Sequence, residues 1–220
     1  MNLSNKIRNV AMGAGLIALA VSGTAIKPKD VNAEILRVET HELGGATLEG
    51  DVTMGKVRNQ LRLDYGEIPI AYGLTFNDEN DSQVVLEFYA SKNGSWTRTG
   101  RDIGGNIAII SGKNFIDLPE LTKTDYDKLE QKLERTEPEG VCDDYNVMLL
   151  HRYKSKSEKP RFQARFPNGD TMQVLSSKNG TFTTLNIDPG GTACLDGVGT
   201  DMEITPKKLR NYKIENQISL

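Results

Sequence analysis

The sequence of 220 residues has few of the side chains on which many catalytic and metal sites depend. It contains two cysteines, two histidines and one tryptophan. Two cysteines are too few for a disulfide-rich scaffold or a four-cysteine zinc site, and two histidines argue against a histidine-based metal centre. The Gly-x-Ser-x-Gly, His-Glu-x-x-His and phosphate-loop motifs of common hydrolases and nucleotide-binding proteins are also missing from the sequence.

The sequence also lacks a large excess of charge of either sign. It has 27 Lys and Arg against 30 Asp and Glu, a net charge of −3. Nucleic-acid-binding proteins normally show a strong basic excess, so we expect no nucleic-acid partner. With 37% hydrophobic and 26% charged residues, the composition is that of a soluble globular protein. It excludes a wholly disordered, collagen-like or multi-span membrane protein.

The longest apolar stretch, residues 10–26, is shorter than the roughly 20 residues of a typical membrane-spanning helix. Lys6 and Arg8 precede it, and the small residues Gly23-Thr24-Ala25 near its end offer a cleavage site. This order is typical of a signal peptide. We expect residues 1–25 to be a signal peptide or a retained signal anchor, followed by a linker or strand over residues 26–45. The protein would then be secreted, periplasmic or at the cell surface, and would touch a membrane only through an uncleaved N-terminal segment.

One segment of the sequence occurs twice. SKNGSWTRTGRDIGG at residues 91–105 and SKNGTFTTLNIDPGG at residues 177–191 share eight of 15 positions at a constant offset of 86. Asn-Gly pairs are favoured in hairpins in which both residues take a positive φ, and that preference alone would explain a repeated Asn-Gly. It does not explain why Asp-x-Gly-Gly recurs at the same distance, so we expect a tandem duplication.

Alternating apolar and polar runs, separated by polar turns, flank both copies and predict antiparallel strands. The expected strands cover residues 74–76, 83–90 and 95–102, then 164–166, 171–176 and 181–188, with further strands at 60–65 and 146–153. Helices are expected at residues 122–135 and 206–212. The predicted fold class is therefore α+β and β-rich. It consists of two tandem related modules, residues 46–136 and 141–220, each an antiparallel β-meander of about four strands followed by a helix.

The two cysteines are the first candidate site. In an exported protein, Cys142 and Cys194 are expected to form a disulfide, which would close a loop of roughly 50 residues and stabilise the fold by about 4 kcal/mol. The alternative is a secreted hydrolase in which Cys142 is the nucleophile and His151, on a predicted strand, is the base. Asp143 and Asp144, directly after Cys142, would oppose formation of a thiolate.

Two further sets of residues are candidates for binding. Trp96 and Phe182 occupy the same position in the two copies and could stack on a sugar or a partner chain, although packing in the core is the usual role of such residues. Asp78, Asn80 and Ser82 offer oxygen ligands at alternate positions for calcium. The loop lacks the glycine of an EF-hand and its final glutamate, so a solvated turn is the alternative.

The residues shared by the two copies are turn, bend and packing types, which specify a fold rather than a reaction. We therefore expect an exported, non-enzymatic protein of two duplicated β-rich modules. It would bind a protein or glycan partner, or serve a structural role, at the cell surface or in the envelope. The alternatives are the hydrolase above and a calcium-dependent adhesion module. No cofactor is expected, and calcium is the only candidate ligand of that kind.

Overall fold

A computed structural model describes residues 38–40, 45–48, 52–77 and 82–206. The chain divides into two compact units, residues 1–35 and 36–220, and the described residues all belong to the second. The expected signal segment, residues 1–25, lies outside the described residues. The helices are α1 (Met54–Tyr65), α2 (Lys123–Glu130) and α3 (Tyr145–Lys156). No helix in the described part of the chain is long and apolar enough to cross a membrane.

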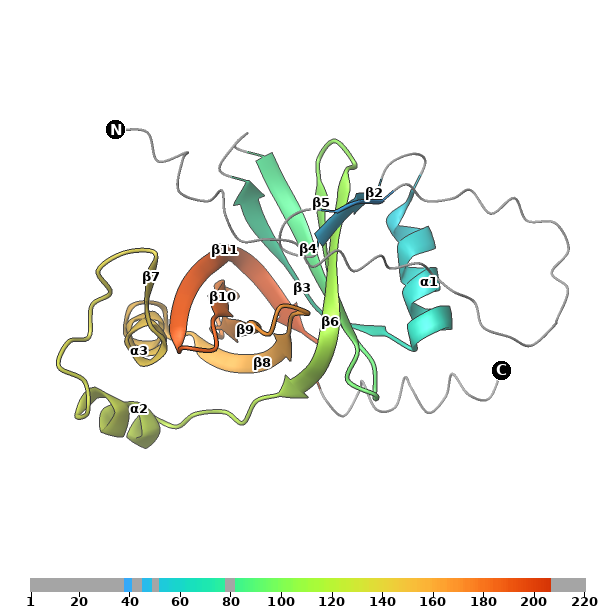
Figure 1. The fold of residues 1–220 in the computed structure, drawn as a ribbon. Coiled ribbons are helices and arrows are strands. Elements are labelled where there is room, and N and C mark those ends of the chain that lie inside the picture. Colours follow the sequence, from blue (N-terminus) through green and yellow to red (C-terminus); the bar gives the residue numbers. More distant parts are fainter. Residues whose placement is uncertain (1–37, 41–44, 49–51, 78–81, 207–220) are drawn as a thin grey trace, which may run out of the picture. The chain divides into compact units, whose positions relative to one another are not determined.

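The strands of the described residues all belong to one antiparallel sheet. They are β1 (Val38–Thr40), β2 (Gly45–Leu48), β3 (Ile68–Asn77), β4 (Ser82–Ala90), β5 (Trp96–Asp102), β6 (Ile107–Asp117), β7 (Cys142–Asp144), β8 (Lys159–Arg165), β9 (Thr171–Ser176), β10 (Phe182–Ile187) and β11 (Thr192–Ile204). Their order is β1-β2-β6-β5-β4-β3-β11-β10-β9-β8, and β7 pairs with β11 (Figure 1). A further pairing, β6 with β8, closes strands β3–β6 and β8–β11 into a ring. The predicted β-rich α+β fold is thus confirmed.

The ring consists of two halves with the same order of elements. The first half is α1-β3-β4-β5-β6 and the second half is α3-β8-β9-β10-β11. The first strand of each half pairs with the last strand of the other, which gives a β3–β11 seam and a β6–β8 seam. The seams have matching hydrogen bonds. The amide of Thr205 donates to the carbonyl of Ile70 over 2.8 Å, and that of Leu118 donates to the carbonyl of Arg161 over 2.9 Å.

The interior of the ring is filled by aromatic and aliphatic side chains from both halves. Phe88 of β4 packs edge-to-face on Phe162 of β8, with 5.4 Å between ring centroids. The helices cover the outer side. Helix α1 packs on Tyr89 and Ile107, which alternate with residues that point into the ring. Each half therefore covers the inner face of the other half, while its own helix lies on the outer side.

The repeated SKNG segments form the β4–β5 and β9–β10 turns. Gly94 and Gly180 have φ of 84° and 83°, a conformation that residues with a side chain rarely adopt. Each glycine lies against the backbone of a residue on the last strand of its half, Asn114 or Asp201, at 3.4 to 3.7 Å from where a Cβ would lie. The expectation that the preceding asparagine also takes a positive φ is wrong, because only the glycines do.

The repeated Asp-x-Gly-Gly segments form the β5–β6 and β10–β11 turns. The Asp102 carboxylate accepts a hydrogen bond from the Asn106 amide over 2.9 Å. Asp188 accepts one from the Thr192 amide over the same distance. Gly105 and Gly191 again take a positive φ. The repeat therefore encodes turns, as the sequence indicated.

The strands expected at residues 60–65 and 146–153 are wrong, because these residues lie in α1 and α3. Thr53 caps α1, and the buried residues Met54, Val57 and Leu61 follow a helical spacing. In α3, residues 147–150 are all buried because the helix lies between the sheet and α2. The helix thus precedes the strands in each half. The helix expected at residues 122–135 is confirmed as α2, though shorter, and the one expected at 206–212 falls almost entirely outside the described residues.

Candidate functional site

Trp96 and Phe182, expected from the sequence to contact a partner, are both buried in the ring. The Trp96 indole donates a hydrogen bond to the carbonyl of Arg165 over 3.1 Å. A Cβ in place of a hydrogen of Gly112 or Gly199 would collide with the Trp96 or the Phe182 ring respectively. Both rings are buried, in agreement with the alternative of core packing, and a partner-binding role for them stays a prediction from the sequence.

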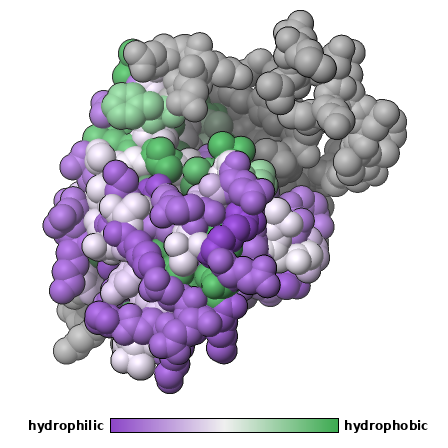
Figure 2. Space-filling view, turned by 90° about the vertical axis from the view of Figure 1, so that its left-hand side faces the viewer, coloured by the Kyte–Doolittle hydropathy of each residue, from purple (hydrophilic) through white to green (hydrophobic). Residues whose placement is uncertain are grey.

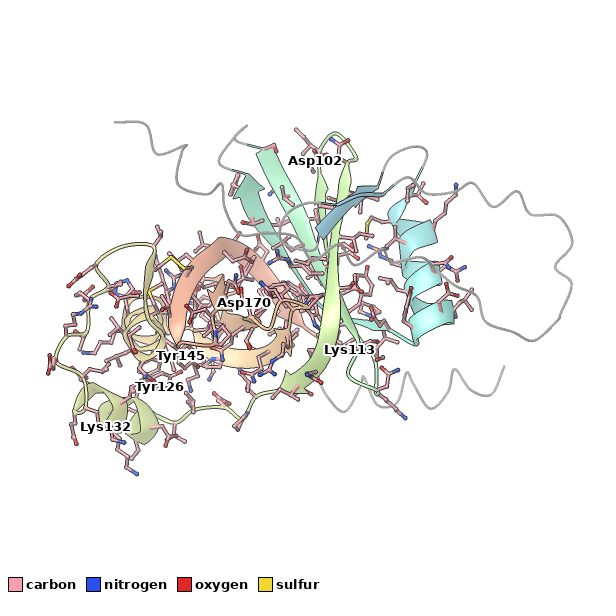
Figure 3. All side chains as sticks on the ribbon, in the orientation of Figure 1. Asp102, Lys113, Tyr126, Lys132, Tyr145 and Asp170 are labelled. Atoms are coloured by element: carbon pink, nitrogen blue, oxygen red, sulfur yellow. A yellow bond between two sulfur atoms is a disulfide. The ribbon has the colours of Figure 1, made fainter. Side chains whose placement is uncertain are left out.

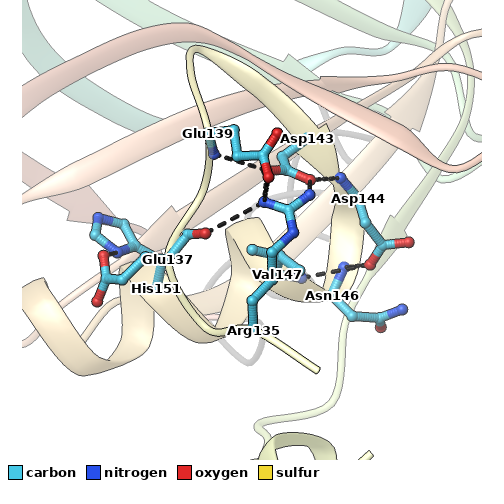
Figure 4. A network of polar contacts seen from close by, with 8 residues as sticks. All are labelled: Arg135, Glu137, Glu139, Asp143, Asp144, Asn146, Val147 and His151. Atoms are coloured by element: carbon cyan, nitrogen blue, oxygen red, sulfur yellow. Dashed lines mark hydrogen bonds and ion pairs between the residues drawn. The ribbon is translucent and has the colours of Figure 1, made fainter. Parts of the chain in front are cut away.

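Cys142 of β7 and Cys194 of β11 form a disulfide. The expected bond leaves no free cysteine in the sequence, so a secreted hydrolase with a Cys142 thiolate has no nucleophile. His151 lies on α3 rather than on the predicted strand, and its Nδ1 is 2.8 Å from the Glu137 carboxylate (Figure 4). This pair does not include either cysteine.

The segment between α2 and β7 is held by a network of charges beside the disulfide (Figure 4). Both terminal nitrogens of Arg135 donate to the Asp143 carboxylate over 2.5 Å. The same carboxylate accepts from the amides of Glu139 and Asp144 over 2.9 and 2.7 Å. The guanidinium of Arg135 and these amides lower the pKa of Asp143 to about 2. The acceptor positions of the Asp143 carboxylate are all used, which indicates a structural role and not that of a reactive group. We call this network the Arg135–Asp143 clamp.

Asp78 and Asn80, two of the three residues expected to bind calcium, lie outside the described residues, and Ser82 begins β4. Within residues 52–77 and 82–206 no group of three acidic, histidine or cysteine side chains lies close enough to hold a metal ion. The calcium hypothesis therefore stays a prediction from the sequence.

The outer face of the second half is closed by α2 and α3. Tyr126 of α2 is buried and stacks on Tyr153 of α3, with 3.6 Å between ring centroids. Figure 3 shows Tyr126 and Tyr145 at these two helices, and both belong to a cluster that includes Leu175 and Leu185 of the strands below. Among the described residues, α2 and α3 thus cover a cluster of apolar side chains on this face.

The outer face of the first half is only partly covered. Under α1, Arg58 donates to Glu87 over 3.0 Å and to the Tyr89 hydroxyl over 3.3 Å. Burial tends to raise the pKa of Glu87, but the hydrogen bonds from Arg58 and Tyr89 outweigh it, and the pKa lies below its ordinary value. This ion pair marks the border of the part of the face that α1 covers.

Beyond that border lies a row of apolar side chains, which we call the apolar strip: Tyr72, Leu74 and Phe76 of β3, Val85 of β4 and Val198 of β11. Tyr72, Phe76 and Val198 are 46%, 58% and 48% exposed. Leu74 pairs directly with Val85, so the strip is continuous across neighbouring strands. Figure 2 shows hydrophobic residues gathered towards the top of the view, above a largely hydrophilic surface.

The strip points outward because the inner face has no room for it. A Cβ on Gly73, between Tyr72 and Leu74, would lie 2.8 Å from the Phe182 ring. Side chains alternate along a strand, so the neighbours of Gly73 face the outside. The sequence pattern does not reveal this surface, because an alternating Tyr-x-Leu-x-Phe run normally predicts a core-facing strand. The glycine between the apolar residues was the signal that could have found it.

The other seam provides an internal comparison for the strip. Leu74 pairs with Val85, and the matching residues Arg165 and Thr171 pair in the second half. By the same register Gln163 matches Tyr72, and Ser111 of β6 matches Val198. At these four positions one seam is apolar on its outer face where the other carries Gln, Arg, Thr and Ser; at a fifth position the order is reversed, with Glu203 matching the exposed Ile116. The fold itself does not require the apolar residues of the strip.

A shallow hollow borders the strip on the side of β5. It is lined by Gln83, Val85, Arg101, Asp102, Ile103 and Gly105. Arg101 pairs with Val85 across the strands, and Ile103 is 82% exposed. The hollow extends the apolar surface and adds one cation to it.

Comparison with known proteins leaves the chain without a family. No protein-family model matches it, and no curated protein does. A solved structure described as "Crystal structure of fusion DH domain" aligns with 80% of this chain and 94% of its own at 11% identity, with a TM-score of 0.16. A likeness this weak carries no argument about fold or function.

Proposed function

We propose that this chain is an exported, non-enzymatic protein that binds a protein partner through the apolar strip, at the cell surface or in the envelope. The observation that carries the proposal is the contrast between the two seams. Tyr72 and Val198 at the β3–β11 seam are apolar and about half exposed, whereas Gln163 and Ser111 match them at the β6–β8 seam. Contiguous exposed apolar surface is typical of interaction sites.

We further propose that the two halves are the products of a tandem duplication, with the modules at residues 46–136 and 141–220. The repeated turns support it, and so do features that the sequence does not display. Gly66 and Ser157 both end the first helix of a half with a positive φ. Asn114 and Asp201, both non-glycine residues with a positive φ, occupy matching places on the last strands. After a duplication, one copy can diverge in surface residues while the shared scaffold persists.

Export is supported by the charged, apolar and small-residue order of residues 1–25. The Cys142–Cys194 disulfide supports it as well, because such bonds persist in oxidising compartments. A retained anchor in place of a cleaved signal would tether the protein to the membrane.

Site-specific photo-crosslinking in cells that export the protein tests the proposal. A photoreactive amino acid in place of Phe76 should give a covalent adduct with a partner protein. The matched control is Ile116, which is 48% exposed on the opposite seam and should give none. Adding Tyr72→Gln and Val198→Ser, which install the residues of the other seam, should abolish the adduct. Equal adducts at both positions, or none at Phe76, would count against the strip as the binding surface.

A further inference from the structure

Arg101 is an exposed cation at the edge of the apolar strip, and its charge contributes to lowering the pKa of Glu87. It makes no hydrogen bond or ion pair with any of the residues that the structure describes. Two carboxylates of the neighbouring strands and turn, Glu87 and Asp102, are hydrogen-bonded to other residues. Glu87 is held by Arg58, and Asp102 accepts two hydrogen bonds from Asn106. The charge of Arg101 is therefore available to a molecule that covers the strip.

The fold does not require an arginine at this position. Val85 pairs with Arg101, and the matching residue Thr171 pairs with Ile187 in the second half. Ile187 packs against the cluster beneath α2 and α3. In the first half the same place is uncovered and carries a positive charge beside Val85 and Ile103. This is the second difference, after the strip itself, that distinguishes the two outer faces.

We propose that the partner is a protein segment that presents apolar side chains followed by a carboxylate, the apolar groups on the strip and the carboxylate on Arg101. This inference rests on the proposed function. The guanidinium is a planar fork that binds a carboxylate through two parallel hydrogen bonds. Glu203 lies at the opposite edge of the strip, where it pairs with the Tyr72 hydroxyl. Its negative charge repels a carboxylate there, so the two edges together fix the direction in which the segment lies.

Two capped peptides, acetyl-Leu-Phe-Glu-amide and acetyl-Leu-Phe-Gln-amide, test the proposal by titration into the ¹⁵N-labelled protein, followed by NMR. They differ only in the charge of the last side chain. Both should shift the amide signals of the strip, and the acidic peptide should bind about two- to five-fold more tightly, as an exposed ion pair allows. Arg101→Gln should remove this preference and leave the binding of the neutral peptide unchanged. Arg165→Gln, the matched control on the other seam, should leave the preference intact.

The outcomes separate this inference from the function on which it rests. If the strip signals shift equally with both peptides, the carboxylate partner is wrong while a binding role for the strip stands. If neither peptide shifts them, the proposed function fails too. Peptide binding that appears only after removal of residues 207–220 would assign the strip to the chain's own C-terminal segment and overturn the inference. A dimer in sedimentation experiments that Leu74→Arg dissociates would assign the strip to a second copy and overturn it as well.

Discussion

Glu67 and Glu158 are matching buried glutamates with opposite surroundings. Each directly follows the residue that ends the helix of its half, and they are 3% and 0% exposed. The amide of Glu158 bonds to the carbonyl of Arg152, whose side chain donates back to its carboxylate over 3.0 and 3.2 Å. The amide of Glu67 donates to the carbonyl of Leu61, whose side chain carries no charge that could pair with the Glu67 carboxylate. One buried carboxylate is thus neutralised and the other is not.

Replacing Glu67 should therefore stabilise the protein at neutral pH. Burial raises the pKa of Glu67, and the hydrogen bonds from Thr97 and Ser95 only partly oppose this. A raised pKa means that the folded state is favoured while the group is protonated and loses stability as pH rises through the folded pKa. We expect Glu67→Gln to raise the free energy of unfolding by about 1 kcal/mol at pH 7. The gain should vanish at about pH 3.5, where both states are protonated.

Urea denaturation at the two pH values measures the effect of Glu67→Gln. Glu158→Gln is the matched control and should have the opposite sign, because it leaves the buried Arg152 without its partner. Its expected cost is about 3 kcal/mol. If Glu67→Gln destabilises the protein at pH 7 as much as Glu158→Gln does, the carboxylate of Glu67 has a stabilising partner in the folded state and the prediction is wrong.

At the scale of the elements, the sequence predicted the strands better than the helices. The strands beside the repeated turns were found because Asn-Gly and Asp-x-Gly-Gly fix where a strand ends. Helices α1 and α3 were taken for strands for two different reasons. Leu61 and Leu63 alternate like a strand, yet Leu63 is largely exposed. Residues 147–150 are uniformly apolar because α2 covers the side of α3 that would otherwise face water, and no local pattern reports a contact made by another element.

The candidate site shows the same limit. The disulfide could be predicted, because two cysteines in an exported protein leave one pairing. The strip could not, because its exposure depends on ring closure. Phe182 of the second half fills the space inside Gly73, so the apolar side chains of β3 that flank the glycine face outward. The position of Arg101 at the edge of the strip likewise depends on its pairing with Val85 of the neighbouring strand.

The disulfide is the strongest single constraint on the short strand β7. This strand has three residues and pairs only with β11, and the bond joins positions that are 52 residues apart. We expect the double variant Cys142→Ser/Cys194→Ser to lose about 2–4 kcal/mol of unfolding free energy. The Arg135–Asp143 clamp should keep the segment docked, so the circular dichroism spectrum below the transition should match that of the wild type. A spectrum that loses helical signal would show that the bond, and no other contact, positions α2 and α3.

At the scale of the whole molecule, ring closure makes the two halves depend on one another. Each half would expose an entire inner face of aromatic residues without the other, because Phe88 and Trp96 of the first half pack on Phe162 and Phe166 of the second. The two seams supply the only backbone pairing between the halves among the described residues. The two halves therefore form a closed molecule in which the core belongs to neither half.

Because the halves depend on one another, the two fragments of a chain that is cut between them should remain associated. Gly140 is exposed, lies between the halves in sequence and has nothing within 4 Å of where a Cβ would be, so a protease site can be inserted there. After cleavage, both cysteines lie in the second fragment, and no covalent bond joins the two. We expect the fragments to elute together in native gel filtration, to separate only in denaturant, and to unfold in one cooperative transition. Separately expressed fragments should aggregate. If either fragment folds alone with a native-like spectrum, the shared core is not what holds the ring closed.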